Sequence, residues 1–250
     1  MSAKEDAFAF SSRRPAERLG VAVVSELVEL IVTGELPEGE LLPPEGTLCE
    51  HFGVSRTVLR ESVKRLEEKG LVVVAQGRGT QVAQSGSWNM LDPVVLSALI
   101  DNDVSLGVLD ELTIVRGSLE SAMAGAVATR RTAEELTRIE HALESMRETQ
   151  HESDSFRQAD VVFHLTIMEL SRNRLAENIA KRLYRRALES SRYQGMRYED
   201  AFHSTVEEHA LVVDAISRKD AEAAERAMRD HIVSSWERRR LGAPEEEPGL

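Results

Sequence analysis

The sequence predicts a mainly helical protein with a small N-terminal α+β head and an all-helical antiparallel bundle. Three observations support this prediction. Apolar residues recur at helical spacing along most of the 250 residues. Strand-like segments are confined to residues 71–83, and a polar stretch at 84–89 separates the two parts. We expect the head at 11–84, a linker and connecting helix at 85–104, the bundle at 105–240 and a disordered tail at 241–250.

The head is expected to contain three helices and a β-hairpin. Gly53 favours a tight turn between the second and third helices because it has no Cβ. Ser55 is placed to cap the third helix. This order is that of a winged helix-turn-helix, whose third helix enters the major groove of DNA. The expected elements are helices at Pro15–Thr33, Glu45–His51 and Ser55–Lys69 and strands at Leu71–Ala75 and Thr80–Ala83.

The rest of the chain reads as helices without strands. Thr132 and Ser204 each precede a glutamate by three residues, a pattern typical of a capping box, and Asp220 is placed to cap the last helix. The expected helices are Pro93–Asp101, Leu106–Arg130, Ala133–Thr149, Ser155–Ser171, Arg174–Gln194, Thr205–Ser217 and Ala221–Arg240.

The distribution of charge leaves DNA binding open although the formal net charge is −12. Residues 54–80 contain six basic and three acidic side chains, so this segment carries +3 and the rest of the chain −15. Affinity for phosphate depends on the local patch. The alternative is a solvated helix face on which the basic side chains pair with neighbouring glutamates. The candidate DNA contacts are Ser55, Arg56, Thr57 and Arg60 on the third helix and Gly77 and Arg78 in the hairpin turn.

One carboxylate and three histidines suggest a metal site in the bundle. Asp160 and His164 are four residues apart and therefore share a helix face. His209 and His231 lie on two later helices, each among apolar residues at helical spacing. Converging from three helices, these four side chains could hold one divalent cation. Taken singly, each histidine has the alternative of a structural or exposed side chain.

The stretch Leu42–Gly70 resembles the head of GntR-type bacterial transcription regulators. Its Val-Ser-Arg-Thr-x-x-Arg-Glu core implies DNA contacts from Ser55, Arg56, Thr57 and Arg60, and the preceding Leu-Pro-x-Glu motif adds Glu45. The family usually has arginine after that glutamate, where this chain has Gly46. A DNA contact from the second helix is therefore in question.

Residues 105–238 resemble the FCD effector-binding domain of the FadR subgroup. Its metal-binding members have Asp-x-x-x-His and two later histidines, which implies Asp160, His164, His209 and His231 as ligands. Zinc is the expected ion, with nickel and manganese as alternatives. The resemblance also implies that Arg116 faces the effector; the alternative is an ion pair with Glu120, four residues on. Residues 88–96 resemble the linker of repressors that respond to sugar acids.

Together these patterns predict a homodimeric repressor that binds palindromic half-sites and releases DNA when a small carboxylate or sugar acid binds. A metal-dependent enzyme is less consistent with the sequence, which has no His-Glu-x-x-His motif. A third interpretation has a purely structural metal and a lipid or partner protein as effector. The single cysteine, Cys49, and the lack of a bilayer-length apolar run predict a cytoplasmic protein without membrane contact.

Overall fold

The computed structural model describes residues 15–75, 77, 79–190, 193 and 202–241. The chain divides into two compact units, Met1–Ala98 and Leu99–Leu250, which we treat separately and call the head and the body. The boundary falls inside α4 (Pro93–Asn102). Within the described residues, no helix is both long and apolar enough to cross a bilayer.

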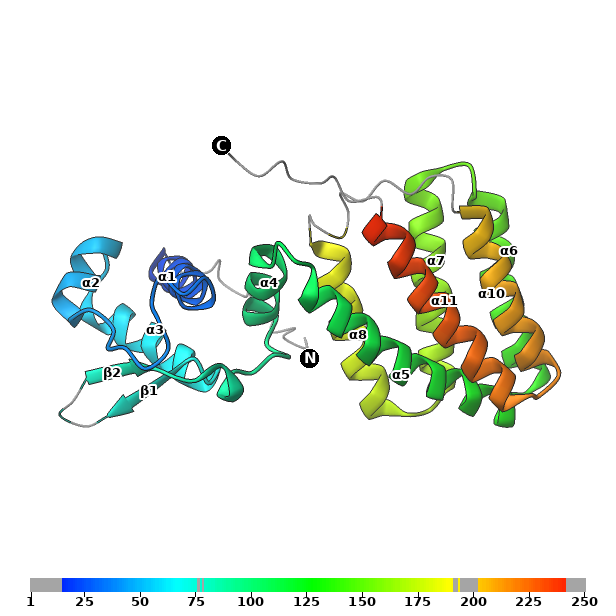
Figure 1. The fold of residues 1–250 in the computed structure, drawn as a ribbon, viewed down its shortest axis with the longest axis horizontal. Coiled ribbons are helices and arrows are strands. Elements are labelled where there is room, and N and C mark those ends of the chain that lie inside the picture. Colours follow the sequence, from blue (N-terminus) through cyan, green and yellow to red (C-terminus); the bar gives the residue numbers. More distant parts are fainter. Residues whose placement is uncertain (1–14, 76, 78, 191–192, 194–201, 242–250) are drawn as a thin grey trace, which may run out of the picture. The chain divides into compact units, whose positions relative to one another are not determined.

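The head contains three helices and an antiparallel hairpin, as the sequence predicts (Figure 1). Helix α3 packs against α1, α2 and β1, so it is the centre of the unit. The strands pair in a register that runs from Val72 opposite Val82 to Ala75 opposite Gly79. The elements are α1 (Pro15–Val32), α2 (Glu45–Phe52), α3 (Arg56–Glu68), β1 (Val72–Ala75) and β2 (Gly79–Val82).

The turn between α2 and α3 has the geometry that the sequence predicts. Gly53 ends α2 in the left-handed conformation with φ 61°, and its N–H donates to the carbonyls of Cys49 and Glu50. Ser55 caps α3, and its hydroxyl accepts from the N–H of Val58 at 3.4 Å. These caps fix the angle at which α3 leaves the turn. The winged helix-turn-helix prediction is confirmed.

The polar stretch predicted to be a linker is folded onto the end of α3. It contains a short 3₁₀ helix, η1 (Ser85–Ser87), and the hydroxyl of Ser87 donates to the carbonyl of Gly70 at 2.9 Å. The N–H of Asn89 donates to the carbonyl of Lys69 at 2.9 Å. Lys69 also forms an ion pair of 2.5 Å with Asp92, a residue that accepts from the first N–H groups of α4. The side chains of Ser87 and Asn89 therefore bond to local backbone groups although they are exposed.

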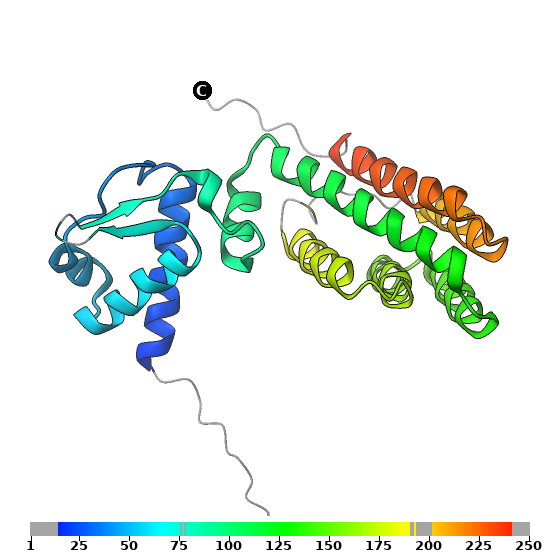
Figure 2. The same cartoon turned by 90° about the horizontal axis from the view of Figure 1, so that it is seen from below.

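The body is a helical bundle around α5 (Gly107–Arg130), which packs against α7, α8, α10 and α11 (Figure 2). Its apolar core includes the buried side chains of Ile139, Met146, Phe163 and Met228. Burial of such side chains is the main source of stability in a helical bundle. The other helices are α6 (Ala133–Thr149), α7 (Ser153–Leu170), α8 (Arg174–Glu189), α10 (Phe202–Ser217) and α11 (Ala221–Leu241).

Four details of the body test the predicted helix ends. Thr132 forms the predicted capping box with Glu135, and Asp220 accepts from the N–H of Ala223 at 3.0 Å. The capping box predicted at Ser204 is wrong, because α10 already begins at Phe202. The helix predicted to run to Gln194 ends at Glu189, where the N–H of Ser190 returns to the carbonyls of Arg186 and Ala187. Residues 242–250, nearly all of the expected tail, lie outside the described residues.

Candidate DNA surface and metal centre

The predicted DNA contacts of α3 lie together on the surface of the head. Ser55, Arg56, Thr57 and Arg60 are all exposed, and they occupy the cap and first two turns of the helix. Side chains at the N-terminal end of a recognition helix are the ones that reach base edges. Gly77 is exposed in the hairpin turn with φ 76°, whereas Arg78 lies outside the described residues.

Glu45 and Arg60 form an ion pair that the sequence did not indicate. The Nε of Arg60 donates to Oε1 of Glu45 at 3.0 Å, and Nη2 donates to Oε2 at 3.2 Å. The hydrogen bond from Arg60 lowers the pKa of Glu45. Both side chains are well exposed, so the pair is worth little in stability. The pair joins α3 to the first residue of α2.

In the body, the structure brings the four predicted metal ligands together. One ligand atom from each of Asp160, His164, His209 and His231 lies within 4.8 Å of all the others. Nε2 of His209 is 3.3 Å from Nε2 of His164 and 3.6 Å from Oδ1 of Asp160. All three imidazoles are buried. Sequence spacing had paired only two of these residues, and the packing of α7, α10 and α11 adds the other two.

Each histidine uses Nδ1 for a hydrogen bond that directs Nε2 toward the cluster. Nδ1 of His164 lies 2.7 Å from Oε2 of Glu120, and Nδ1 of His231 lies 2.9 Å from Oε2 of Glu208. Nδ1 of His209 lies 2.8 Å from the carbonyl of Thr205. Because all three partners are acceptors, Nδ1 carries the proton and Nε2 has a free lone pair. This arrangement is typical of metal-binding histidines.

The donor set fits a divalent metal ion. Oδ1 of Asp160 is buried and has no hydrogen-bond partner among the described residues, while Oδ2 accepts from the hydroxyl of Tyr184 at 2.9 Å. A buried carboxylate oxygen without a partner is costly unless a cation or water completes it. Three imidazole nitrogens and one carboxylate oxygen suit zinc and neighbouring transition metals better than magnesium or calcium.

Burial favours the neutral form of two imidazoles of the cluster, His209 and His231. Burial lowers the pKa of His209 well below its usual value, and His231 and His164 lower it further. Burial also lowers the pKa of His231, although the hydrogen bond to Glu208 opposes the shift. Metal binding requires the neutral form of imidazole, so this environment keeps the ligands ready to bind.

Arg116 lines a small pocket next to the cluster and is also paired with Glu120. Its Nε donates to Oε1 of Glu120 at 2.7 Å, and its guanidinium lies 3.8 Å from the centre of the Tyr184 ring. Burial alone would raise the pKa of Glu120, but the charge of Arg116 and the hydrogen bonds from His164 and Arg116 outweigh it and lower the pKa to about 2. Arg116 therefore pairs with Glu120 and also lines the pocket, so the two roles expected for it are compatible.

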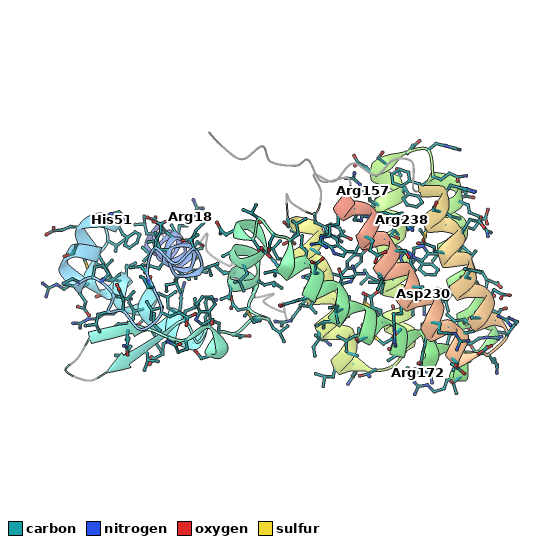
Figure 3. The ribbon with its side chains drawn as sticks, viewed as in Figure 1. Arg18, His51, Arg157, Arg172, Asp230 and Arg238 are labelled. Atoms are coloured by element: carbon teal, nitrogen blue, oxygen red, sulfur yellow. The ribbon has the colours of Figure 1, made fainter. Side chains whose placement is uncertain are left out.

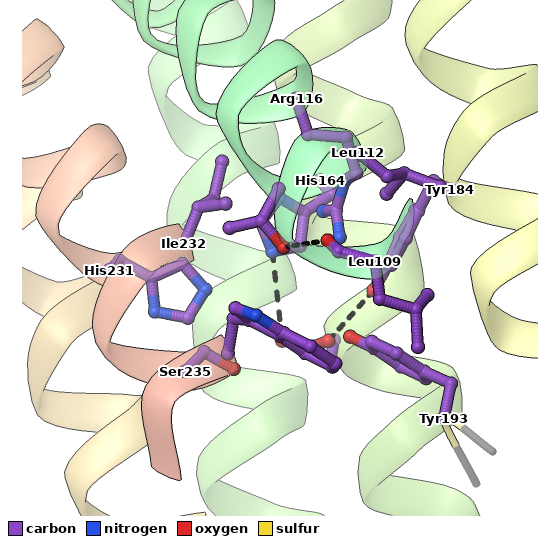
Figure 4. Close-up of a pocket in the computed structure, with 12 residues that line it drawn as sticks. Leu109, Leu112, Arg116, His164, Tyr184, Tyr193, His231, Ile232 and Ser235 are labelled. Carbon is purple, nitrogen blue, oxygen red and sulfur yellow. Dashed lines mark hydrogen bonds and ion pairs between the residues drawn. The ribbon is translucent and has the colours of Figure 1, made fainter. Parts of the chain in front are cut away.

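The pocket encloses about 20 Å³, which is room for a water molecule or an ion. In Figure 4, His231, Ile232 and Ser235 of α11 lie on one side and Tyr184 and Tyr193 on the other. The Nε1 of Trp236, which also lines the pocket, donates to Oδ1 of Asp110 at 2.6 Å.

Sequence reasoning missed the residues that orient the ligands. The sequence indicates Glu120 only as a partner of Arg116, and it indicates Glu208 only as the neighbour of His209 in the FCD-like motif. Glu208 also accepts two hydrogen bonds from Arg238 of α11, which is labelled in Figure 3. The signal available in the sequence was helical spacing, which places Glu120 on the apolar face of α5. The structure confirms that this position is buried, with Glu120 1% exposed. A carboxylate on such a face requires buried partners.

A winged helix-turn-helix head joined to an all-helical body is the architecture of a class of transcription regulators. Comparison with known families agrees. Residues 19–82 match the family described as bacterial regulatory proteins, gntR family, and residues 111–234 match the FCD domain. The chain belongs to the GntR family of bacterial transcription regulators and carries an FCD domain.

Several characterised regulators are similar to this chain. The galactonate operon transcriptional repressor of Escherichia coli K12 is 33% identical, over 86% of this chain and 94% of that protein. The transcriptional repressor NanR of Cronobacter sakazakii is 30% identical, over 89% and 86%. Among solved structures, Lar of Listeria monocytogenes has the same fold, with a TM-score of 0.57 and 17% identity over 93% of this chain and 99% of that chain. These relatives are regulators and not enzymes.

Proposed function

We propose that this regulator is a repressor whose affinity for operator DNA is controlled by a small carboxylate, such as a sugar acid, bound beside a divalent metal ion. The observation that carries the proposal is the cluster of three Nε2 atoms and the unpartnered Oδ1 of Asp160, next to a pocket lined by Arg116. In this scheme residues 11–84 bind DNA and residues 105–240 bind the effector and form the dimer.

Asp160, His164, His209 and His231 would hold the metal, and zinc suits this donor set. When bound, the ion supplies a positive charge and a coordination position for an acid. Arg116 supplies a second cation to the same pocket. Since Glu120 occupies Nε of Arg116, a ligand carboxylate would meet the two terminal nitrogens, which have no hydrogen bond within the described part of the chain.

The small size of the pocket implies that acid binding moves side chains. About 20 Å³ does not accommodate an organic acid, so the lining residues must shift to admit one. A ligand that binds only a rearranged body can change the population of DNA-binding states, whereas one that binds both states equally cannot. The name of the galactonate operon repressor supports a sugar acid as the class to test first.

On the DNA side, we propose contacts from Ser55, Arg56, Thr57 and Arg60 on α3, with Glu45 orienting Arg60. Gly77 and Arg78 would meet the sugar-phosphate backbone at the wing. A homodimer would place two such heads on palindromic half-sites.

The test combines metal, acid and DNA in one titration. Purified protein, metal-free or zinc-loaded, is mixed with a fragment of its own promoter at fixed salt, and galactonate or another hydroxy acid is added. We expect binding of the fragment without acid, and release by at least one acid with the zinc-loaded protein only. Release from metal-free protein to the same extent would reject the role of the metal. Failure to bind the fragment would reject the DNA-binding proposal.

A structural metal with a lipid-like effector is a weaker candidate. The enclosed space beside the cluster is lined by Leu109, Leu112 and Ile232 as well as by charged and polar side chains. An acyl chain placed there would leave Arg116 and Asp160 without a polar ligand group.

A further inference from the structure

The three histidines of the cluster are oriented by three different kinds of partner. His209 is held by a backbone carbonyl, and His231 by Glu208, which is about one-fifth exposed and is paired with Arg238. His164 is held by Glu120, a carboxylate that is almost completely buried. The partner of His164 is therefore the one most completely shielded from water.

Glu120 also connects the cluster to the pocket. Its Oε2 lies 2.7 Å from Nδ1 of His164, and its Oε1 accepts from Nε of Arg116 at 2.7 Å. Arg116 and His164 both line the pocket, whereas Glu208 and its partner Arg238 do not. Arg116, Glu120 and His164 form a continuous chain of charge-assisted hydrogen bonds from the candidate effector contact to a candidate metal ligand.

We propose that Glu120 is a positioning residue that fixes His164 in the tautomer presenting Nε2 to the metal and links acid binding at Arg116 to metal binding. The positioning of His164 is a property of the protein without metal. The link between acid binding and metal binding rests on the proposed function. The geometry explains why a carboxylate is required. Both neighbours of Glu120 donate hydrogen bonds, and a carboxylate can accept from two donors on separate oxygens.

A glutamine at this position could not do the same. It has one accepting oxygen and one donating amide, so either His164 or Arg116 would face another donor. In Glu120→Gln, we expect the single accepting oxygen to go to the charged guanidinium of Arg116, the stronger donor, so that His164 faces the amide N–H and loses its fixed tautomer. The double variant Arg116→Met/Glu120→Gln removes the competing donor. The introduced amide can then accept from His164 alone, and no buried charge is left unpaired.

The first experiment needs no metal. Long-range ¹H–¹⁵N spectra of histidine in the metal-free protein report which ring nitrogen carries the proton. We expect a single Nδ1–H tautomer for His164 in the unmodified chain, a mixture in Glu120→Gln, and recovery of the single tautomer in the double variant. The matched control is Glu208→Gln, which we expect to change His231 and leave His164 unaltered. An unchanged His164 in Glu120→Gln overturns the proposal, and so does a double variant that fails to restore it.

The second experiment measures zinc affinity by competition with a chelator, with and without galactonate. We expect Glu120→Gln to bind zinc roughly 10–100-fold more weakly, the usual cost of losing the partner of a metal-bound histidine. We expect the double variant to recover most of this loss and to lose the dependence on the acid.

The two experiments separate failure of the inference from failure of the proposed function. If the unmodified chain does not bind zinc, the proposed metal function fails, and the tautomer result still decides whether Glu120 positions His164. If zinc binds but its affinity and acid dependence are the same within about two-fold in Glu120→Gln, the link through Glu120 is rejected. If Glu120→Gln does not fold, the double variant decides the positioning role: a single Nδ1–H tautomer of His164 supports it, and a mixture of tautomers rejects it.

Discussion

The head and the body present their candidate functional groups in opposite ways. In the head, Ser55, Arg56, Thr57 and Arg60 are exposed, and the ion pair between Arg60 and Glu45 is open to water. In the body, the candidate ligands are enclosed and held by a second layer of buried hydrogen bonds. Exposed groups can be exchanged with little effect on the fold, whereas each buried group depends on its neighbours. The following predictions use this difference, beginning with the largest effect.

Removal of one buried ligand should abolish metal binding without weakening the head. In His209→Ala, we expect zinc affinity to fall by more than about a hundred-fold, beyond the usual cost of losing a second-layer partner. Bound zinc per chain, measured by mass spectrometry after dialysis, should approach zero while binding of the promoter fragment without acid is retained. His141→Ala removes an exposed imidazole from α6 and is the control. A zinc content in His209→Ala equal to that of the control contradicts the site.

Removal of an exposed cation from the head should have the converse effect. In Arg60→Ala, we expect operator affinity to fall by roughly 1–3 kcal/mol, since a direct contact to a base or phosphate is lost. Zinc content and melting temperature should stay the same. Arg226→Ala, which removes an exposed arginine from an ion pair on α11, is the control. Equal affinity of the two variants in a gel shift at fixed salt would exclude Arg60 from the interface.

The buried histidines should make the stability of the metal-free body dependent on pH. The pKa of His209 is lowered by burial and by two neighbouring histidines, so the folded protein binds its proton at a lower pH than the unfolded chain does. Below about pH 6.5 the unfolded chain binds a proton at this histidine that the folded protein does not bind. The folded protein is therefore more stable above about pH 6.5 and loses stability as the pH falls below that value. For one such group, the free energy of unfolding should decrease by about 1 kcal/mol between pH 6.5 and 5.5.

Urea denaturation at the two pH values checks this dependence. His209→Gln should show a smaller decrease than the unmodified chain. A decrease of the same size in both proteins would mean that another group is responsible.

An effect of similar size, confined to the head, is expected at the ion pair between Lys69 and Asp92. Both side chains are 16% exposed, so the pair is less screened than the surface pairs of the body. In Lys69→Ala, we expect the head to lose about 1 kcal/mol in urea denaturation. Arg218→Ala breaks a well-exposed pair with Asp214 and should cost less. A larger loss in Arg218→Ala would contradict this ranking.

The fold could be predicted because its signals are local. The cap of Ser55, the turn at Gly53 and the capping box of Thr132 each depend on a few neighbouring residues, and all are present in the structure. The prediction was wrong where tertiary contacts decide. At Ser204 the helix extends further toward its N-terminus than the capping pattern indicates, because Phe202 stacks on Phe156.

Only the part of the candidate site that depends on neighbouring residues could be predicted. The spacing of Asp160 and His164 is local, but the roles of Glu120, Thr205 and Glu208 depend on how α5, α7, α10 and α11 pack. The ion pair of Glu45 and Arg60 likewise joins two helices at an angle that no spacing rule gives. Contacts of this kind appear only when the chain is folded.

One close contact in the head has a mechanical consequence. Gly70 has φ 75°, and a Cβ at this position would overlap the carbonyl oxygen of Ser87, so the backbone just beyond α3 is pressed against the chain that leads into α4. The hydrogen bonds from Asn89 to Lys69 and from Ser87 to Gly70 close the same joint. These contacts hold the end of α3 against the segment that leads into α4. A rotation of the start of α4 relative to the end of α3 would therefore have to break these hydrogen bonds.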